Sequence, residues 1–307
     1  MSSRDPDRLA SIPCRLCGGE AAIFGRRTLR GRHDVAFFEC AECGALQTGM
    51  PYWLEEAYQV DGLGLDVGAC QRCVNLSIEV AACLAVLSVA ENEPCLDFGS
   101  GLGLFARLMR DRGFDFRAYD KFIQPFFMDR FCGTLTGGKW SVITAFEVLE
   151  HMVSPGEELA ELLAARPRML LFTTHLWERQ GLDWWYISPE GGQHIFFHTR
   201  KSLQVIAARH GYAYFDLKRV KLFLCDRLAA QDRPLSQWEK IAFRWNRFRW
   251  HGGADLPRDV PTQLQLLRDG KTMRRLGQHL FLKHQAESFR WANRDFAAIG
   301  DRDDKGA

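Results

Sequence analysis

This sequence of 307 residues lacks a hydrophobic run of the roughly 18 uncharged residues that a membrane-spanning helix needs. Its longest apolar stretch, from Val80 to Ala90, contains Ser88 and ends at Glu91. The first nine residues carry four charged side chains and no apolar segment follows them, so they do not resemble a secretory signal peptide. We therefore expect a cytoplasmic protein with no membrane span.

The sequence also has little net charge, +2 at pH 7, which by itself does not indicate a nucleic-acid partner. The charge is uneven, because residues 226–307 hold 16 Lys and Arg against 11 Asp and Glu. Such a basic segment suits an anionic substrate and suits a solvated surface equally well. With 47% hydrophobic and 12% aromatic residues, the chain can bury a large core.

Cysteine, in contrast, is plentiful, and in a reducing compartment ten cysteines indicate thiols or metal ligands rather than disulfides. Two Cys-x-x-Cys pairs stand 22 residues apart, and they comprise Cys14, Cys17, Cys40 and Cys43. Each pair can turn both sulfurs toward one ion, and two pairs complete a tetrahedral Zn²⁺ site with no open position. A redox dithiol would need a single pair, so the duplication favours a structural zinc site.

A nucleotide-binding turn is expected after the apolar run Cys95–Phe98, where Gly99, Gly101 and Gly103 alternate before a helical pattern. Residues without side chains let the backbone approach a bulky ligand, and the following helix points its first amides toward it. Asp120 closes the next apolar run about 20 residues later, where a carboxylate can accept the hydroxyls of a ribose. Together these features indicate a nucleoside-binding site.

From Cys95 onward, strand and helix patterns alternate. Strands are predicted at 95–98, 114–119, 141–146, 168–174, 212–217 and 220–225, and helices at 103–112, 155–165 and 200–210. Continuous apolar strands between helices indicate an α/β fold with a Rossmann-like, doubly wound and mostly parallel sheet. The last two strands have a tight connection near Lys218, which predicts an antiparallel hairpin at one edge.

The pattern also suggests how the chain is divided. We expect a zinc-ribbon module at residues 12–50, a linker and helical lead-in at 51–91, the α/β domain at 92–225, and a helical, basic C-terminal extension at 226–307. The extension interleaves tryptophan with arginine, a combination able to stack on bases or sugars. Helical spacing of its apolar residues favours a packed helix, and no function follows for it.

The chain resembles the class I S-adenosylmethionine-dependent methyltransferases, in the branch with an N-terminal zinc-ribbon module. The resemblance rests on the glycine turn after Asp97, on Asp120, on the Glu-Val-Leu-Glu-His segment that ends at His151, and on Gln193-His194. It implies that Asp97, Gly99, Gly101 and Gly103 hold the methionine end of S-adenosyl-L-methionine, that Asp120 binds its ribose, and that Phe146 and Glu147 lie along it.

The same resemblance implies an acceptor. Members with a zinc module include enzymes that methylate sugars on nucleotides, so we expect O- or C-methylation of a small molecule such as a sugar nucleotide or glycan. His194 and His151 are the candidate catalytic residues, with His194 as the base and His175 as a third, weaker candidate. A stacking wall for the substrate is expected from Trp184, Trp185 and Tyr186.

Two other functions fit the same residues. Zinc ribbons also precede domains that methylate ribosomal or transfer RNA, and the basic segment keeps nucleic acid open as a partner. A non-catalytic zinc-ribbon binding protein is the other alternative. The ribbon segment argues against an RNA substrate. Outside the knuckle at Cys14, its basic residues are confined to Arg26, Arg27, Arg30 and Arg32.

Overall fold

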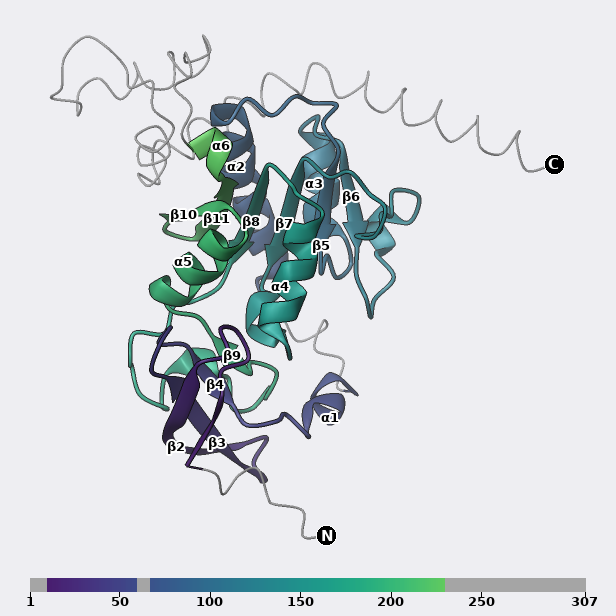
Figure 1. Cartoon of the computed structure of the whole chain (residues 1–307). Helices are drawn as coiled ribbons and strands as arrows, with labels where there is room; N and C mark the ends of the chain where they lie inside the picture. Colours follow the sequence, from purple (N-terminus) through teal and green to yellow (C-terminus); the bar gives the residue numbers. More distant parts are fainter. Residues whose placement is uncertain (1–9, 60–66, 230–307) are drawn as a thin grey trace, which may run out of the picture. The chain divides into compact units, whose positions relative to one another are not determined.

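The computed structural model describes residues 10–59 and 67–229, which form two β-sheets with accompanying helices (Figure 1). The predicted helical extension at 226–307 lies outside the described residues except for the short helix α6 (Asp226–Ala229). Residues 60–66 of the predicted linker lie outside them as well. The class is therefore mixed α/β, with a mostly parallel six-stranded sheet and an N-terminal antiparallel sheet.

The N-terminal sheet contains the segment predicted as a zinc ribbon, with one strand added from far along the chain. Its order is β1-β2-β3-β4-β9, formed by β1 (Ser11–Pro13), β2 (Glu20–Leu29), β3 (His33–Cys40), β4 (Leu46–Thr48) and β9 (Phe196–Phe197). All the neighbouring pairs are antiparallel. Leu46 of β4 lies opposite Phe197 of β9, so the sheet is completed by residues that follow His194.

A tight turn joins the two long strands of this sheet. Arg30 and Gly31 both have positive φ, 52° and 69°, and the amide of Arg32 donates to the carbonyl of Leu29 at 3.2 Å. Two successive residues with positive φ match the twist of a hairpin, which is why glycine is favoured at such positions. The turn presents the side chains of Arg30 and Arg32 at one end of the sheet, where the network described below begins.

The second sheet has the order β10-β11-β8-β7-β5-β6. Its strands are β5 (Cys95–Phe98), β6 (Phe116–Tyr119), β7 (Val142–Phe146), β8 (Met169–Thr173), β10 (Tyr212–Leu217) and β11 (Val220–Cys225). β5 pairs in parallel with both β6 and β7, and β11 pairs antiparallel to β8. The predicted hairpin at the edge is confirmed, with Lys218 at φ 77° in its connection.

The helices predicted at 103–112, 155–165 and 200–210 are present, with ends that differ from the prediction by at most one residue. The helix bounds are α1 (Leu54–Gln59), α2 (Ala69–Val86), α3 (Leu104–Asp111), α4 (Pro155–Ala164) and α5 (Arg200–Arg209), with 3-10 turns η2 (Phe126–Met128), η3 (Leu149–His151) and η4 (Trp185–Ile187). Pro155 opens α4, a position where its missing amide hydrogen costs nothing. A capping box between Thr199 and Ser202 begins α5.

Helix α2 is long and apolar enough to cross a membrane by length and composition, with a mean hydropathy of 1.3. However, 44% of this window is buried within the protein, including Val80 and Leu84. Its Ser77 also accepts a hydrogen bond from Arg112 at 3.0 Å, in contact with α3. These contacts suit a core helix, and the absence of a membrane span stays a prediction.

Chain contacts divide the protein into two compact units. The described part of the first comprises residues within Met1–Gly68, Ala145–Phe215 and Lys221–Asp226, and the described part of the second comprises Ala69–Thr144, Asp216–Val220 and the end of α6. A buried core in the first unit combines side chains from the N-terminal sheet, α1 and the segment after β8: Leu29, Val35, Phe37, Leu46, Trp53, Ala57, Trp177, Tyr186, Ile187, Ile195 and Phe197.

Candidate functional site

Four cysteines converge in the first unit, as the spacing predicts. The sulfurs of Cys14 and Cys43 lie 3.7 Å apart, and those of Cys17 and Cys40 lie 3.5 Å apart. Sulfurs bound tetrahedrally at about 2.3 Å from a zinc ion would be about 3.8 Å apart, so the cluster is consistent with a zinc site. All four ligands come from the protein and three are buried, which leaves no position for a substrate.

The two knuckles of this cluster share one backbone geometry. In the first, the amide of Gly18 donates to the carbonyl of Cys14 at 2.9 Å, and in the second the amide of Gly44 donates to that of Cys40 at 2.9 Å. The second knuckle also contacts α5, because the hydroxyl of Thr199 donates to the carbonyl of Cys43 at 2.7 Å. The cluster therefore connects the N-terminal sheet to residues near position 200.

The glycine turn after β5 lies in the second unit and is held by Asp120. One oxygen of this carboxylate accepts a hydrogen bond from the amide of Gly101 at 2.9 Å. The other oxygen accepts the amides of Phe122 and Ile123 at 2.8 and 3.0 Å. Asp120 thus fixes the turns after both β5 and β6, and its binding of a ribose stays a prediction.

Two glycines of this turn have different reasons to be glycine. At Gly103, with φ 81°, an added Cβ would lie 2.9 Å from Met128, so the backbone passes close to η2. At Gly101, with φ 53°, an added Cβ would meet open space. The backbone at Gly101 is therefore accessible, as a cofactor-binding turn requires.

Asp97, the predicted cofactor residue on β5, is only 3% exposed. It accepts a hydrogen bond from the hydroxyl of Thr144 at 2.7 Å. Burial raises the pKa of Asp97 to about 7, an effect that the hydrogen bond from Thr144 partly offsets. A cationic group bound next to a carboxyl with a pKa near 7 would lower that pKa and so favour the ionised form.

The candidate catalytic residues lie in the first unit, His151 in the turn η3 that follows β7 and His194 in the loop before β9. Glu147 follows β7 with φ 53°, and its amide donates to the hydroxyl of Thr173 at 2.9 Å. Glu150, in the turn η3, is fully buried and accepts a hydrogen bond from the hydroxyl of Tyr186 at 2.5 Å. The second carboxylate oxygen of Glu150 has no hydrogen-bond partner among the described residues.

The structure brings His151 and His194 together. Their rings are 4.9 Å apart and nearly perpendicular, at 80°. Nδ1 of His151 lies 3.1 Å from the carbonyl oxygen of Gln193, and Nδ1 of His194 lies 2.5 Å from that of Tyr186. Because a carbonyl can only accept, both Nδ1 atoms carry the hydrogen, and each Nε2 keeps its lone pair.

Burial determines the charge of this cluster. It lowers the pKa of His151 to about 3, helped by the neighbouring His194, and it lowers the pKa of His194 as well. Burial also raises the pKa of Glu150 to about 8, with a further contribution from the charge of Glu147. Both imidazoles are therefore neutral at pH 7.

The aromatic residues predicted as a substrate wall have different surroundings. Tyr186 is buried against His194 and His175, with ring centroids 4.5 and 4.6 Å away, and Trp184 packs against the core of the first unit. Trp185 is 67% exposed, and its ring lies 4.9 Å from that of His175. Of the three, Trp185 has the most surface free for contact with a ligand.

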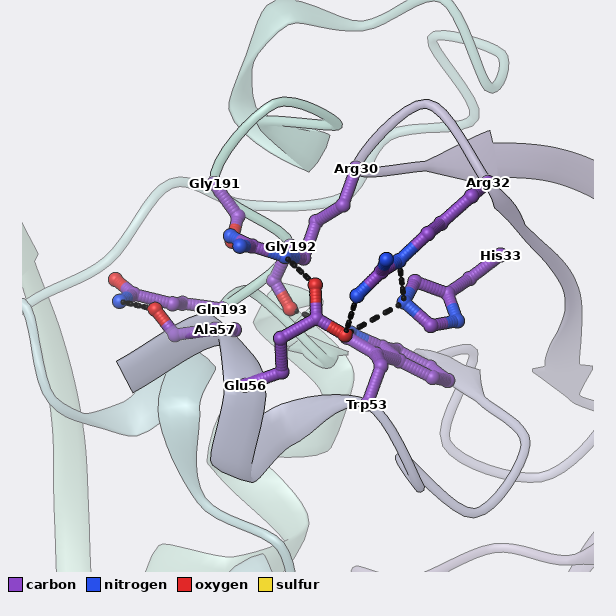
Figure 2. A network of polar contacts seen from close by, with 9 residues as sticks. All are labelled: Arg30, Arg32, His33, Trp53, Glu56, Ala57, Gly191, Gly192 and Gln193. Carbon is purple, nitrogen blue, oxygen red and sulfur yellow. Dashed lines mark hydrogen bonds and ion pairs between the residues drawn. The ribbon is translucent and has the colours of Figure 1, made fainter. Parts of the chain in front are cut away.

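A network around Glu56 holds the loop that carries His194 (Figure 2). Its carboxylate pairs with Arg30 at 3.0 Å, with His33 at 3.3 Å, and with Arg32. The pairing with Arg32, followed by that with Arg30, lowers the pKa of Glu56 to about 2. Arg30 in turn donates to the carbonyl of Gly191 at 3.3 Å, which connects the hairpin of the N-terminal sheet to the loop.

Two further hydrogen bonds hold the same loop (Figure 2). The indole nitrogen of Trp53 donates to the carbonyl of Gly192 at 2.7 Å, and the side-chain amide of Gln193 donates to the carbonyl of Ala57 at 2.9 Å. The hydroxyl of Tyr58, just after Ala57 on α1, lies 3.2 Å from Nδ1 of His151. Helix α1 thus contacts both histidine-bearing segments.

Sequence reasoning missed Glu150 and the network of Glu56. Glu150 stands between predicted residues in the Glu-Val-Leu-Glu-His segment, and its three-residue spacing from Glu147 was available as a signal. Arg30 and Trp53 gave no such signal, because their partners are backbone carbonyls more than 130 positions away.

Comparison with known proteins identifies the domain. Residues 79–217 match a family model described as a methyltransferase domain. A search of curated proteins found no match. Among solved structures, magnesium protoporphyrin IX methyltransferase from Synechocystis PCC 6803, with bound SAH, aligns at 13% identity and a TM-score of 0.37, over 57% of this chain and 95% of that one. A possible histamine N-methyltransferase from Thermotoga maritima aligns at 11% identity and 0.40, over 57% and 100%.

Proposed function

The protein is an S-adenosylmethionine-dependent methyltransferase through its domain at residues 79–217, and we propose that it methylates a hydroxyl or an acidic carbon of a small molecule, a sugar nucleotide or glycan. The observation that carries this proposal is the contact between the imidazoles of His151 and His194, whose ring centroids lie 4.9 Å apart and whose pKa values burial lowers. Methyl transfer from a sulfonium is an in-line displacement, and a base is needed only where the acceptor must lose a proton.

His194 is the better base of the two. Its Nδ1 hydrogen is fixed by the carbonyl of Tyr186, so Nε2 can accept a proton from the acceptor. His151 is more deeply desolvated, and a pKa of about 3 makes it a weak base. In this proposal His194 takes the proton, His151 orients it through ring contact, and the exposed Trp185 stacks on the acceptor.

The cofactor is assigned to the residues that the sequence predicts. S-adenosylmethionine would be held by Asp97, by the turn of Gly99, Gly101 and Gly103, and by Asp120, with Phe146 and Glu147 along it. The accessible backbone of Gly101 and the carboxylates at the ends of β5 and β6 support this assignment. The methyl donor supplies the electrophile, and this chain's residues position the acceptor and remove its proton.

The charges of the N-terminal sheet support a small molecule over RNA. Arg26 pairs with Asp34 at 2.9 Å, and Arg27 pairs with Asp183 at 3.9 Å. Arg30 and Arg32 both pair with Glu56. Arginines already paired with carboxylates are poorly available for phosphates, on which the affinity for RNA depends.

The proposal is tested by separating cofactor binding from turnover. Calorimetry of S-adenosylmethionine should give saturable binding that Asp120→Ala removes, whereas Asp111→Ala, which breaks only an exposed pair with Arg107, should leave it intact. With sugar nucleotides as acceptors, His194→Ala should lower kcat by roughly 10²- to 10⁴-fold at unchanged cofactor affinity. Absence of cofactor binding by the wild-type chain would refute the enzyme assignment. Equal turnover in His194→Ala would refute the base.

A further inference from the structure

Glu150, His151 and His194 form a group of lone-pair donors in the first unit. One oxygen of Glu150 and one nitrogen of each imidazole all lie within 4.8 Å of one another. The cysteine cluster is the other group of this kind in the described part of the chain. The two differ in chemistry, because nitrogen and oxygen replace sulfur at the second.

Neighbouring backbone carbonyls prepare both imidazoles to bind a cation. Each Nδ1 hydrogen is donated to a carbonyl oxygen, that of Gln193 for His151 and that of Tyr186 for His194. Histidines that bind metals in proteins almost always donate their other ring N–H in this way, which fixes the tautomer and the ring orientation. No hydrogen bond to either Nε2 is present among residues 10–59 and 67–229.

The carboxylate of Glu150 has the same one-sided arrangement. Its first oxygen accepts the hydroxyl of Tyr186, and its second oxygen is buried without a partner among the described residues. A fully buried oxygen without a donor is costly to leave unpaired. Glu147 adds a second carboxyl group nearby, and neither group forms an ion pair within the described residues. The site therefore offers lone pairs on two imidazoles and two carboxyl groups, with no cationic side chain paired to them in the described part of the chain.

We propose that Glu150, His151 and His194 bind one divalent transition-metal cation, such as Mn²⁺, Fe²⁺ or Zn²⁺. Two imidazoles and a carboxylate are a ligand set typical of these ions, and three protein ligands leave coordination positions open for a substrate. Ligand atoms bound at about 2.1 Å lie roughly 3 to 3.5 Å apart, so a pair as far apart as 4.8 Å would have to approach by up to about 1.5 Å on binding.

The cation deepens the function proposed above, and this part of the inference rests on that proposal. Coordination of the acceptor oxygen would lower its pKa and orient it for methyl transfer. With the cation bound, Nε2 of His194 would be a ligand, so the role of base proposed above for His194 would apply to the metal-free protein alone. His175, exposed beside Tyr186 and Trp185 and outside the ligand group, is the remaining imidazole able to receive the proton.

Binding of Mn²⁺ to the full-length chain tests the site without using methyl transfer. Electron paramagnetic resonance measures free Mn²⁺ as the protein is titrated, and thiolates select softer ions, so the cysteine cluster should not interfere. We expect about one Mn²⁺ bound per chain. His194→Ala and Glu150→Ala should weaken binding by at least roughly 10-fold, and His175→Ala, the matched control, should leave it unchanged.

Tyr186→Phe guards against loss of folding in the ligand variants. It removes only the hydroxyl that holds the first oxygen of Glu150, and we expect an affinity loss of about 10-fold with the same melting temperature in the presence of EDTA. Absence of saturable Mn²⁺ binding at millimolar concentrations would overturn the inference, as would equal binding by the wild type, Tyr186→Phe and His194→Ala. Cofactor binding that survives in such a protein would leave the proposed function standing.

Discussion

Asp97 combines full burial with a hydrogen bond that satisfies only part of its carboxylate. The hydroxyl of Thr144 donates to one oxygen, and the carboxyl has a pKa of about 7 in the folded protein. When the pKa of an acid is higher in the folded protein than in the unfolded chain, there is a pH range in which the folded protein keeps the proton and the unfolded chain has released it. Folding then becomes less favourable as pH rises from about 4 to about 7.

Asp97→Asn should remove this pH dependence. Asparagine keeps an oxygen that can accept from Thr144 and carries no charge, so the variant should gain stability relative to wild type as pH rises from 4 to 8, by up to about 4 kcal/mol. Urea unfolding at pH 5 and pH 8 without cofactor measures the difference. The pH-dependent contributions of other groups, including Glu150, are the same in the wild type and the variant, so they cancel in the difference between the two stabilities. A stability difference equal at the two pH values would contradict the prediction.

At the scale of elements, the loop at Gly191–His194 depends on contacts with the N-terminal sheet and α1. Arg30, in the β2–β3 hairpin, donates a hydrogen bond to this loop, and so does Trp53, the residue before α1. A base or a metal ligand must be placed to within a fraction of an ångström, and a misplacement of about 1 Å can cost roughly 10²-fold in rate. The network in Figure 2 therefore holds the loop that ends at His194, the candidate base or metal ligand.

Trp53→Phe tests this positioning. Phenylalanine keeps most of the buried ring but loses the donor to the carbonyl of Gly192, which leaves a buried acceptor unpaired at a cost of about 1–3 kcal/mol. We expect kcat to fall by roughly 10-fold or more while the affinity for S-adenosylmethionine stays the same. Arg26→Ala, which breaks an exposed ion pair on the same sheet, is the control and should have wild-type kcat. An equal loss in both variants would argue against a specific role for Trp53.

The elements themselves could be predicted closely from the sequence. Strands at 95–98, 212–217 and 220–225 have the expected bounds, because continuous apolar runs there end at glycine, aspartate or a two-residue turn. The cysteine cluster followed from spacing alone. Strand β9 could not be predicted, because two residues carry no periodicity and their partners in β4 lie about 150 positions away.

The site could be predicted only in part. His151 and His194 were expected as candidates, and the structure places their rings in contact. The bond between Glu150 and Tyr186, and the loop contacts of Arg30 and Trp53, depend on the path of residues 175–194 through the core, which has no regular pattern. Nor does the sequence indicate that Tyr186 is buried while Trp185 is exposed.

At the scale of the whole molecule, the zinc-knuckle segment and the segment around His194 share one hydrophobic core in the first unit. Arg15, between the first two cysteines, donates to the carbonyls of Ile195 at 2.7 Å and Val153 at 3.1 Å. Trp177 donates to Glu39 of β3 at 3.0 Å. Neither segment completes its burial or its hydrogen bonds without the other.

Loss of the four-cysteine cluster, the predicted zinc site, should therefore affect the candidate catalytic residues. Elemental analysis should find about one zinc per chain with four cysteines bound, and Cys40→Ser should lower that content and the melting temperature. Because the core is shared, turnover should fall in parallel, while Cys83→Ser, a buried cysteine outside the cluster, should keep its zinc. Full zinc content in a variant lacking both Cys14 and Cys17 would exclude this site.

The pairing of β4 with β9 has a consequence for how this enzyme could be recombined or could have diverged. If the N-terminal ribbon alone were transferred to a related catalytic domain, its sheet would lack its own strand β9. The corresponding strand of the recipient would lack its own partner, β4. Functional chimeras should need residues 10–59 and the stretch from Trp177 to Thr199 to come from one parent. Substitutions in one of these two segments should accordingly be accompanied by substitutions in the other among related sequences.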